Sequence, residues 1–85
     1  MHGNSEIGRE LKVSDLKPRT VVWLSKYEDQ FASMWVAEIT PELVFFYAEK
    51  TKPMQFVGIR WGDEHEIIRD DSGARIHLYE YLGEV

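Results

Sequence analysis

The segment from Arg75 to Leu82 constrains the fold more than any other part of this 85-residue chain. Its even positions are Ile76, Leu78, Glu80 and Leu82, and its odd positions are Arg75, His77, Tyr79 and Tyr81. Side chains alternate between two faces along a β-strand, so one face is mostly apolar while the other can both pack and hydrogen-bond. The pattern predicts a strand with a core face and a candidate binding face.

Similar short segments, rich in β-branched and aromatic residues, recur upstream at spacings of about 10 to 12 residues, with a turn signal at each junction. The expected strands cover residues 20–26, 31–40, 43–50, 54–61, 64–70 and 75–82. Residues 31–40 also fit a helical stripe, but a strand is favoured because the segment is short and lies between strands. The sequence therefore predicts an all-β fold, a small six-stranded antiparallel barrel or meander.

The N-terminal segment, residues 1–12, is polar and has only Ile7 and Leu11 as apolar anchors. We expect a flexible tail there, with a single β-barrel domain over residues 13–85. Residues 13–18 suit one helical turn that ends at Pro18. The N-terminus lacks the apolar stretch of a secretory signal, and no apolar run approaches the roughly 20 residues that span a bilayer.

Composition limits the classes of function. The absence of cysteine excludes disulfides and thiolate chemistry, and it fits a cytoplasmic location. The net charge of −5 disfavours a nucleic-acid partner, since an acidic protein is repelled by a phosphate backbone. The basic residues of the second half lie among acids and form no dense basic run; they are Lys50, Lys52, Arg60, Arg69 and Arg75.

The segment Leu16-Lys17-Pro18-Arg19-Thr20-Val21-Val22-Trp23 resembles the entry to the first strand of SH3-like barrels of the KOW and Tudor types. Those barrels often have a Leu-x-Pro-Gly turn before a Val-rich strand, and this chain has Arg19 where the glycine would often stand. The resemblance covers about eight residues and the strand count. It implies an SH3-like barrel and no particular function, because such folds serve many functions.

The Asp70-Asp71-Ser72-Gly73 segment sets the expected register of the last two strands. A type I turn with Gly73 in the left-handed conformation would place Asp70 opposite Ala74, Ile68 opposite Ile76 and Arg69 opposite Arg75. A two-residue loop at Ser72-Gly73 is the alternative and would pair Asp70 with Arg75.

The preferred register extends the odd face of the last strand onto its neighbour, with Ile67 opposite His77 and His65 opposite Tyr79. The candidate binding surface then comprises His65, Ile67, Arg69, Arg75, His77, Tyr79 and Tyr81. Tyrosine and arginine are enriched at interface hot spots, which favours a recognition surface. The alternative is a solvated sheet face whose amphipathic side chains shield the backbone.

Two other constellations have specific chemistry. In Asp63-Glu64-His65-Glu66, neighbouring strand residues point to opposite faces, so only Asp63 with His65, or Glu64 with Glu66, could share a face. His77 could add a third ligand on the odd face, but no metal or cofactor is expected. The rings of Trp23, Tyr27, Trp35, Tyr47 and Trp61 could form an aromatic cage of the kind found in Tudor-like readers of methylated lysine. We expect most of these rings in the core instead.

No nucleophile motif or phosphate-binding loop accompanies the serines, so an enzyme is not expected. The strands between Leu43 and Trp61 are apolar on both faces, while a barrel buries only one. The N-terminal tail, the turn at residues 13–16 or a second copy of the chain could cover the outer face, and the last of these predicts a homodimer. The sequence favours a small non-enzymatic protein-interaction module, with a nucleic-acid-associated barrel as the alternative.

Overall fold

The computed structural model describes residues 6–27, 30–49 and 56–83. These residues form seven strands and two short 3-10 helices, η2 (Val13–Asp15) and η3 (Asp63–His65). The strands are β1 (Ile7–Leu11), β2 (Val21–Tyr27), β3 (Gln30–Ile39), β4 (Leu43–Tyr47), β5 (Phe56–Trp61), β6 (Ile67–Arg69) and β7 (Arg75–Tyr81). All strand pairs are antiparallel.

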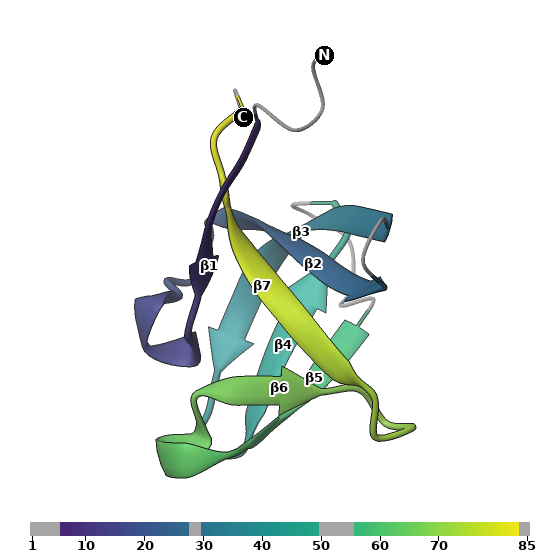
Figure 1. Ribbon diagram of the computed structural model, residues 1–85. Helices are drawn as coiled ribbons and strands as arrows, with labels where there is room; N and C mark the ends of the chain where they lie inside the picture. The colour runs from purple at the N-terminus through teal and green to yellow at the C-terminus, as the bar shows by residue number, and fades with distance from the viewer. Residues whose placement is uncertain (1–5, 28–29, 50–55, 84–85) are drawn as a thin grey trace.

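Strands β2 to β7 form a closed barrel, which confirms the predicted all-β class and the six-stranded antiparallel arrangement. Each strand pairs with the next one in sequence, and β7 pairs with both β2 and β6 to close the barrel. Figure 1 shows β2 and β7 crossing in front of β3, β4 and β5. A small closed barrel of this kind agrees with the fold-level SH3-like resemblance of the β2 entry segment.

Alternation along the strands builds the core. In β7, Ile76 and Leu78 are buried, whereas Glu80 and Leu82, the next even residues along the segment, are exposed. The even face of this segment is therefore core only in its first half. The buried apolar residues of the described chain are Val13, Leu16, Val22, Leu24, Val36, Val44, Phe46, Ile68, Ile76 and Leu78.

The predicted turn between β6 and β7 is confirmed. The Gly73 amide donates to the Asp70 carbonyl over 3.0 Å, and the Asp70 amide donates to the Ala74 carbonyl over 2.9 Å. Gly73 has φ +93°, a left-handed conformation that glycine adopts without a steric penalty. Ile68 faces Ile76 and Arg69 faces Arg75, as the preferred register requires.

That register does not extend further along β6. The expected strand over residues 64–70 is reduced to Ile67–Arg69, because residues 63–65 form the 3-10 helix η3. Glu64 and His65 both have φ +59°, outside the extended region that a strand requires. The predicted His65–Tyr79 and Ile67–His77 pairs are consequently not formed.

Strand β1 lies inside the segment that we expected to be a loose tail. It pairs with the half of β7 that β6 does not reach, with Leu11 opposite Leu78 and Glu10 opposite Tyr79. The Glu6 carbonyl accepts a hydrogen bond from the Leu82 amide over 2.8 Å. The sequence Ile-Gly-Arg-Glu-Leu lacks strand propensity, so pairing with an available strand edge decides its conformation.

The connection from β1 to β2 holds the barrel at the same seam. The Val13 amide donates to the Glu66 carbonyl over 2.9 Å, and Val13 and Leu16 are both buried. Arg19 has φ +70°, a left-handed conformation that favours glycine. Glycine would adopt this conformation without a steric penalty. No helix among the described residues is long and apolar enough to cross a membrane.

Candidate functional site

Five ring-bearing side chains gather on the outer face of β2, β3 and β7, and we call this surface the aromatic face. They are Trp23, Phe31, His77, Tyr79 and Tyr81. Each of the five is partly exposed. The surface overlaps the odd face of β7 that the sequence marked as a binding candidate.

The rings form one continuous network. Trp23 and Tyr81 are stacked, with ring centroids 5.1 Å apart and an interplanar angle of 25°. Phe31 makes edge contacts with Trp23 at 6.4 Å and with Tyr79 at 5.6 Å, while His77 stacks on Tyr79 at 6.5 Å. Aromatic pairs at such distances stabilise one another by about 0.5–1.5 kcal/mol beyond their buried area, so the rings hold a defined arrangement.

Strand pairing explains why these residues meet. Trp23 on β2 lies directly opposite Tyr79 on β7, and Ser25 lies between Phe31 on β3 and His77 on β7. Directly paired residues of an antiparallel sheet point to the same face. The small side chain of Ser25 is buried, since the larger neighbours on either side cover it.

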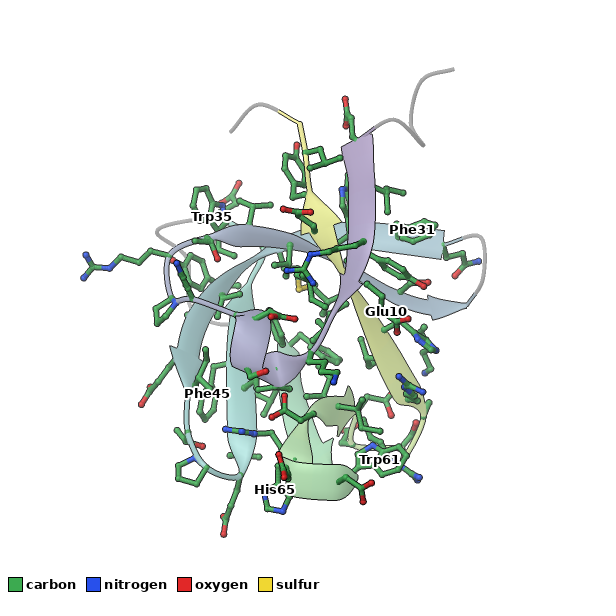
Figure 2. The ribbon with its side chains drawn as sticks, turned by 60° about the vertical axis from the view of Figure 1, so that its left-hand side comes forward. Glu10, Phe31, Trp35, Phe45, Trp61 and His65 are labelled. Carbon is green, nitrogen blue, oxygen red and sulfur yellow. The ribbon has the colours of Figure 1, made fainter. Side chains whose placement is uncertain are left out.

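Strand β1 supplies a charged border to the aromatic face. Glu10 faces Tyr79, and its carboxylate contacts the His77 ring Nδ1 at 2.8 Å and the Arg75 guanidinium at 3.5 Å. The Trp23 indole N–H donates to the Glu6 carbonyl over 3.1 Å. Figure 2 shows Glu10 and Phe31 on the same side of the molecule. The Trp23 ring of β2 is thereby tied to the residue before β1, and the His77 ring of β7 is tied to β1 itself.

The structure divides the seven predicted surface residues into two groups. His77, Tyr79 and Tyr81 belong to the aromatic face, while Arg75 borders it through Glu10. The remaining three lie beside β5, and Arg69 among them also pairs with Arg75 on its other side; they are His65, Ile67 and Arg69. His65 Nδ1 lies 3.2 Å from the Pro41 carbonyl, and Figure 2 shows His65 well away from Glu10 and Phe31.

The second group surrounds Trp61. Ile67 lies opposite Trp61 across β5 and β6, and the Arg69 guanidinium carbon is 3.6 Å from the centroid of the Trp61 ring. Such a cation–π contact is favourable by about 0.5–1 kcal/mol at an exposed site. Ile59, Trp61, Arg69, Asp70, Asp71 and Gly73 line a shallow hollow of about 330 Å³ here.

The described part of the chain assembles neither the candidate metal site nor the candidate aromatic cage. No group of three histidine, aspartate or glutamate side chains within it could hold a metal ion. The candidate cage residues are dispersed: Trp23 is on β2, Trp35 pairs with Tyr47 across β3 and β4, and Trp61 lies under Arg69. The Tyr27 side chain lies outside the described residues.

The expectation that these cage residues pack in the core is wrong for the four that are described. Trp23, Trp35, Tyr47 and Trp61 are all partly exposed, and the largest fully buried side chain is Phe46. All four occupy outward positions of their strands. Branched aliphatic side chains fill most of so narrow a barrel and leave the wide indole rings outside.

One end of the barrel contains a pocket of about 410 Å³. Its walls include Leu24, Met34, Phe56 and Ile76, together with an ion pair in which the Lys26 ammonium lies 3.0 Å from the Asp70 carboxylate. Hydrogen bonds from the Ser72 side chain and from Lys26 hold the pKa of Asp70 well below its usual value. The amides of Ser72 and Ala74 also donate to this carboxylate, so Asp70 serves the turn.

Comparisons with known proteins find no relative of this chain: no protein-family model, curated protein or solved structure matches it. Sequence reasoning found three residues of the aromatic face and missed Trp23 and Phe31 as members of it. The alternation of β2 and β3 marks both as facing the side opposite to Val22 and Leu24, but only the pairing of β2 with β7 places them beside the tyrosines.

Proposed function

We propose that the chain is a non-enzymatic protein-interaction module that binds a partner protein through the aromatic face. The observation that carries the proposal is a continuous set of five partly exposed rings on the outside of a closed barrel. Tyrosine and tryptophan dominate interface hot spots because they offer large, rigid surfaces that also hydrogen-bond. A cytoplasmic location remains a prediction from the absence of cysteine.

Three properties of the surface support protein binding. The rings are ordered by mutual contacts and by β1, so a partner would restrict few additional side-chain rotamers on binding. Glu10, Arg75 and His77 at the border offer both signs of charge, as interface rims do. The Tyr79 and Tyr81 hydroxyls can donate to or accept from a partner's backbone.

The nucleic-acid alternative receives less support from the described arginines. Arg60 donates to the carbonyls of Thr40 and His65, Arg69 lies on Trp61, and Arg75 contacts Glu10. A strand-binding groove needs aromatic platforms beside a row of cations that follow a phosphate backbone. The two remaining candidates, Lys50 and Lys52, lie outside the described residues.

A capture experiment tests the proposal. The tagged full chain is incubated with an extract of its native host, beside a Tyr79→Ser/Tyr81→Ser variant and a Tyr47→Ser control that makes the same change on β4. Circular dichroism first verifies that all three proteins are folded. We expect a protein that wild type and Tyr47→Ser enrich equally and that the double variant loses.

Equal enrichment by the double variant would overturn the assignment of the aromatic face. Labelled single- and double-stranded oligonucleotides are titrated in parallel at low salt, where electrostatic binding is strongest. Tight binding of an oligonucleotide, lost on Tyr79→Ser/Tyr81→Ser substitution, would replace the protein partner by a nucleic acid.

A further inference from the structure

The hollow beside Trp61 has features that the aromatic face does not explain. Ile59, on its wall, is 43% exposed and is one of two large exposed apolar residues among those described. Ile59 lies opposite Leu43 on β4, and its neighbour Val57 lies opposite Phe45, so the outer surface of β4 and β5 is apolar around it. Water contact with so many apolar groups is unfavourable unless another surface covers them.

The charges at the hollow are not balanced locally. Arg69 lies directly opposite Arg75, a like-charge pair that is unfavourable in a sheet. Glu10 compensates Arg75, whereas Arg69 contacts the Trp61 ring and the Gly73 carbonyl and has no carboxylate within ion-pair distance in the described chain. Asp71, two residues further on, is exposed and likewise has no cation at that distance among the described residues.

The hollow also has a donor without an acceptor. The Trp61 indole N–H is buried and makes no hydrogen bond within the described part of the protein. Buried donors in native proteins nearly always have a partner. Because the Trp61 ring lines the hollow, its N–H resonance reports on contacts made by that ring.

We propose that this hollow is the contact surface between two copies of the chain, related by a two-fold axis that passes between Arg69 and Asp71. Such an axis places each Arg69 opposite the Asp71 of the second copy, so two identical ion pairs form at once. It also brings the exposed Ile59 of each copy over the apolar wall of the other. One surface carries both charges and an apolar centre, which makes it complementary to itself.

A second copy fits these features because a self-complementary surface needs no other partner. The contact is separate from the aromatic face, since Ile59, Trp61 and Arg69 belong to β5 and β6 while the five rings belong to β2, β3 and β7. A dimer would therefore present two aromatic faces and could bind two partner molecules.

Sedimentation equilibrium from micromolar to millimolar concentration tests the proposal. The net charge of −5 makes copies repel, so the buffer contains about 0.15 M salt, which screens charges beyond roughly 8 Å. We expect a concentration-dependent dimer in the wild type. Asp71→Arg should weaken the dimer about tenfold or more, because each ion pair becomes a repulsion.

The Arg69→Asp/Asp71→Arg double variant restores opposite charges and should recover most of the lost affinity. Glu80→Arg makes a comparable charge change on an exposed residue of β7 and should leave association unchanged. In nitrogen–proton NMR spectra, the Trp61 indole signal should shift with concentration while that of Trp23, bonded to Glu6, stays fixed.

Two results would overturn the dimer. The first is a wild type that remains monomeric throughout the concentration range. The second is a dimer that Asp71→Arg leaves intact, since the copies would then meet through another surface. A monomeric wild type leaves the proposed role of the aromatic face unchanged, because the test of that face uses Tyr79 and Tyr81.

Discussion

At the scale of single residues, Asp70 illustrates how one carboxylate can organise a turn. Its Oδ1 accepts hydrogen bonds from the Ser72 amide, the Ser72 hydroxyl and the Ala74 amide, while Oδ2 contacts Lys26. The Ser72 hydroxyl and Lys26 are the main causes of its lowered pKa. The carboxylate therefore joins the β6–β7 turn to β2 only while it is ionised.

This pKa shift predicts a loss of stability in acid. A carboxyl whose pKa is lower in the folded state binds protons more readily when the protein is unfolded. Its contribution to the free energy of unfolding is therefore complete above the ordinary pKa of 3.8. The contribution declines as pH falls through the folded-state pKa. Urea unfolding of wild type and Asp70→Asn should show a gap that is constant near neutral pH and that narrows below about pH 4.

Glu66 and Asp15 change stability with the same sign. A hydrogen bond from the Ser14 amide lowers the pKa of Glu66, and one from the Lys12 amide lowers that of Asp15. A gap between wild type and Asp70→Asn that stays the same down to the lowest pH would contradict the assigned role of Asp70, while leaving these two groups as the source of acid sensitivity.

Arg19 gives a second prediction at this scale, because it holds a left-handed backbone conformation with φ +70°. That conformation costs a non-glycine residue about 1–2 kcal/mol, although glycine loses more backbone entropy on folding. We expect Arg19→Gly to raise the free energy of unfolding by about 0.5 kcal/mol. Chemical denaturation measures the free energy of unfolding, with Lys17→Gly at a nearby exposed position as the control. If both variants lose the same free energy of unfolding, the Arg19 backbone is not strained.

At the scale of elements, β1 and the residue before it contact the candidate site. Glu6 accepts from the Trp23 indole, and Glu10 contacts His77 and Arg75. Leu11 packs against the buried core residues. Strand β1 therefore supports both the barrel and the arrangement of the rings.

Removal of residues 1–11 tests this role. We expect the free energy of unfolding to fall by about 2 kcal/mol or more, since apolar contacts of Leu11 and several hydrogen bonds are lost. A Glu10→Gln variant, which keeps the strand and removes the charge, should lose much less. A truncated protein as stable as the full chain would show that residues 7–11 behave as the loose tail that the sequence suggested.

Sequence patterns recovered the elements whose signals are local. Alternation in β7 identified Ile76 and Leu78 as core, and the Asp70–Gly73 turn gave the correct Ile68–Ile76 register. Strand β1 escaped prediction because its pairing depends on a distant strand edge. The predicted pairing of His65 with Tyr79 is wrong because Glu64 and His65 both have positive φ and belong to the 3-10 helix before β6, so the strand begins only at Ile67.

At the scale of the whole molecule, the barrel separates two outward surfaces. The aromatic face lies on β2, β3 and β7, and the hollow beside Trp61 lies on β5, β6 and the turn that follows. The sequence predicted an apolar exterior between Leu43 and Trp61, and Ile59 is the exposed large apolar residue in the described part of that range. The sequence did not predict that Trp23 and Phe31 belong to the aromatic face, because strand pairing between distant segments decides which outward residues share a surface.

The central claim is that β7 has one face for the core and another for recognition, and neighbouring residues of that strand test it most directly. Urea unfolding compares wild type with Leu78→Ala and Tyr79→Ser. Leu78 is 2% exposed, so its truncation should lower the free energy of unfolding by about 3 kcal/mol. Tyr79 is partly exposed, so Tyr79→Ser should lower the free energy of unfolding by only about 1 kcal/mol, through the missing ring contacts. If Tyr79→Ser destabilises the protein as much as Leu78→Ala, the aromatic face is a second core layer and not a recognition surface.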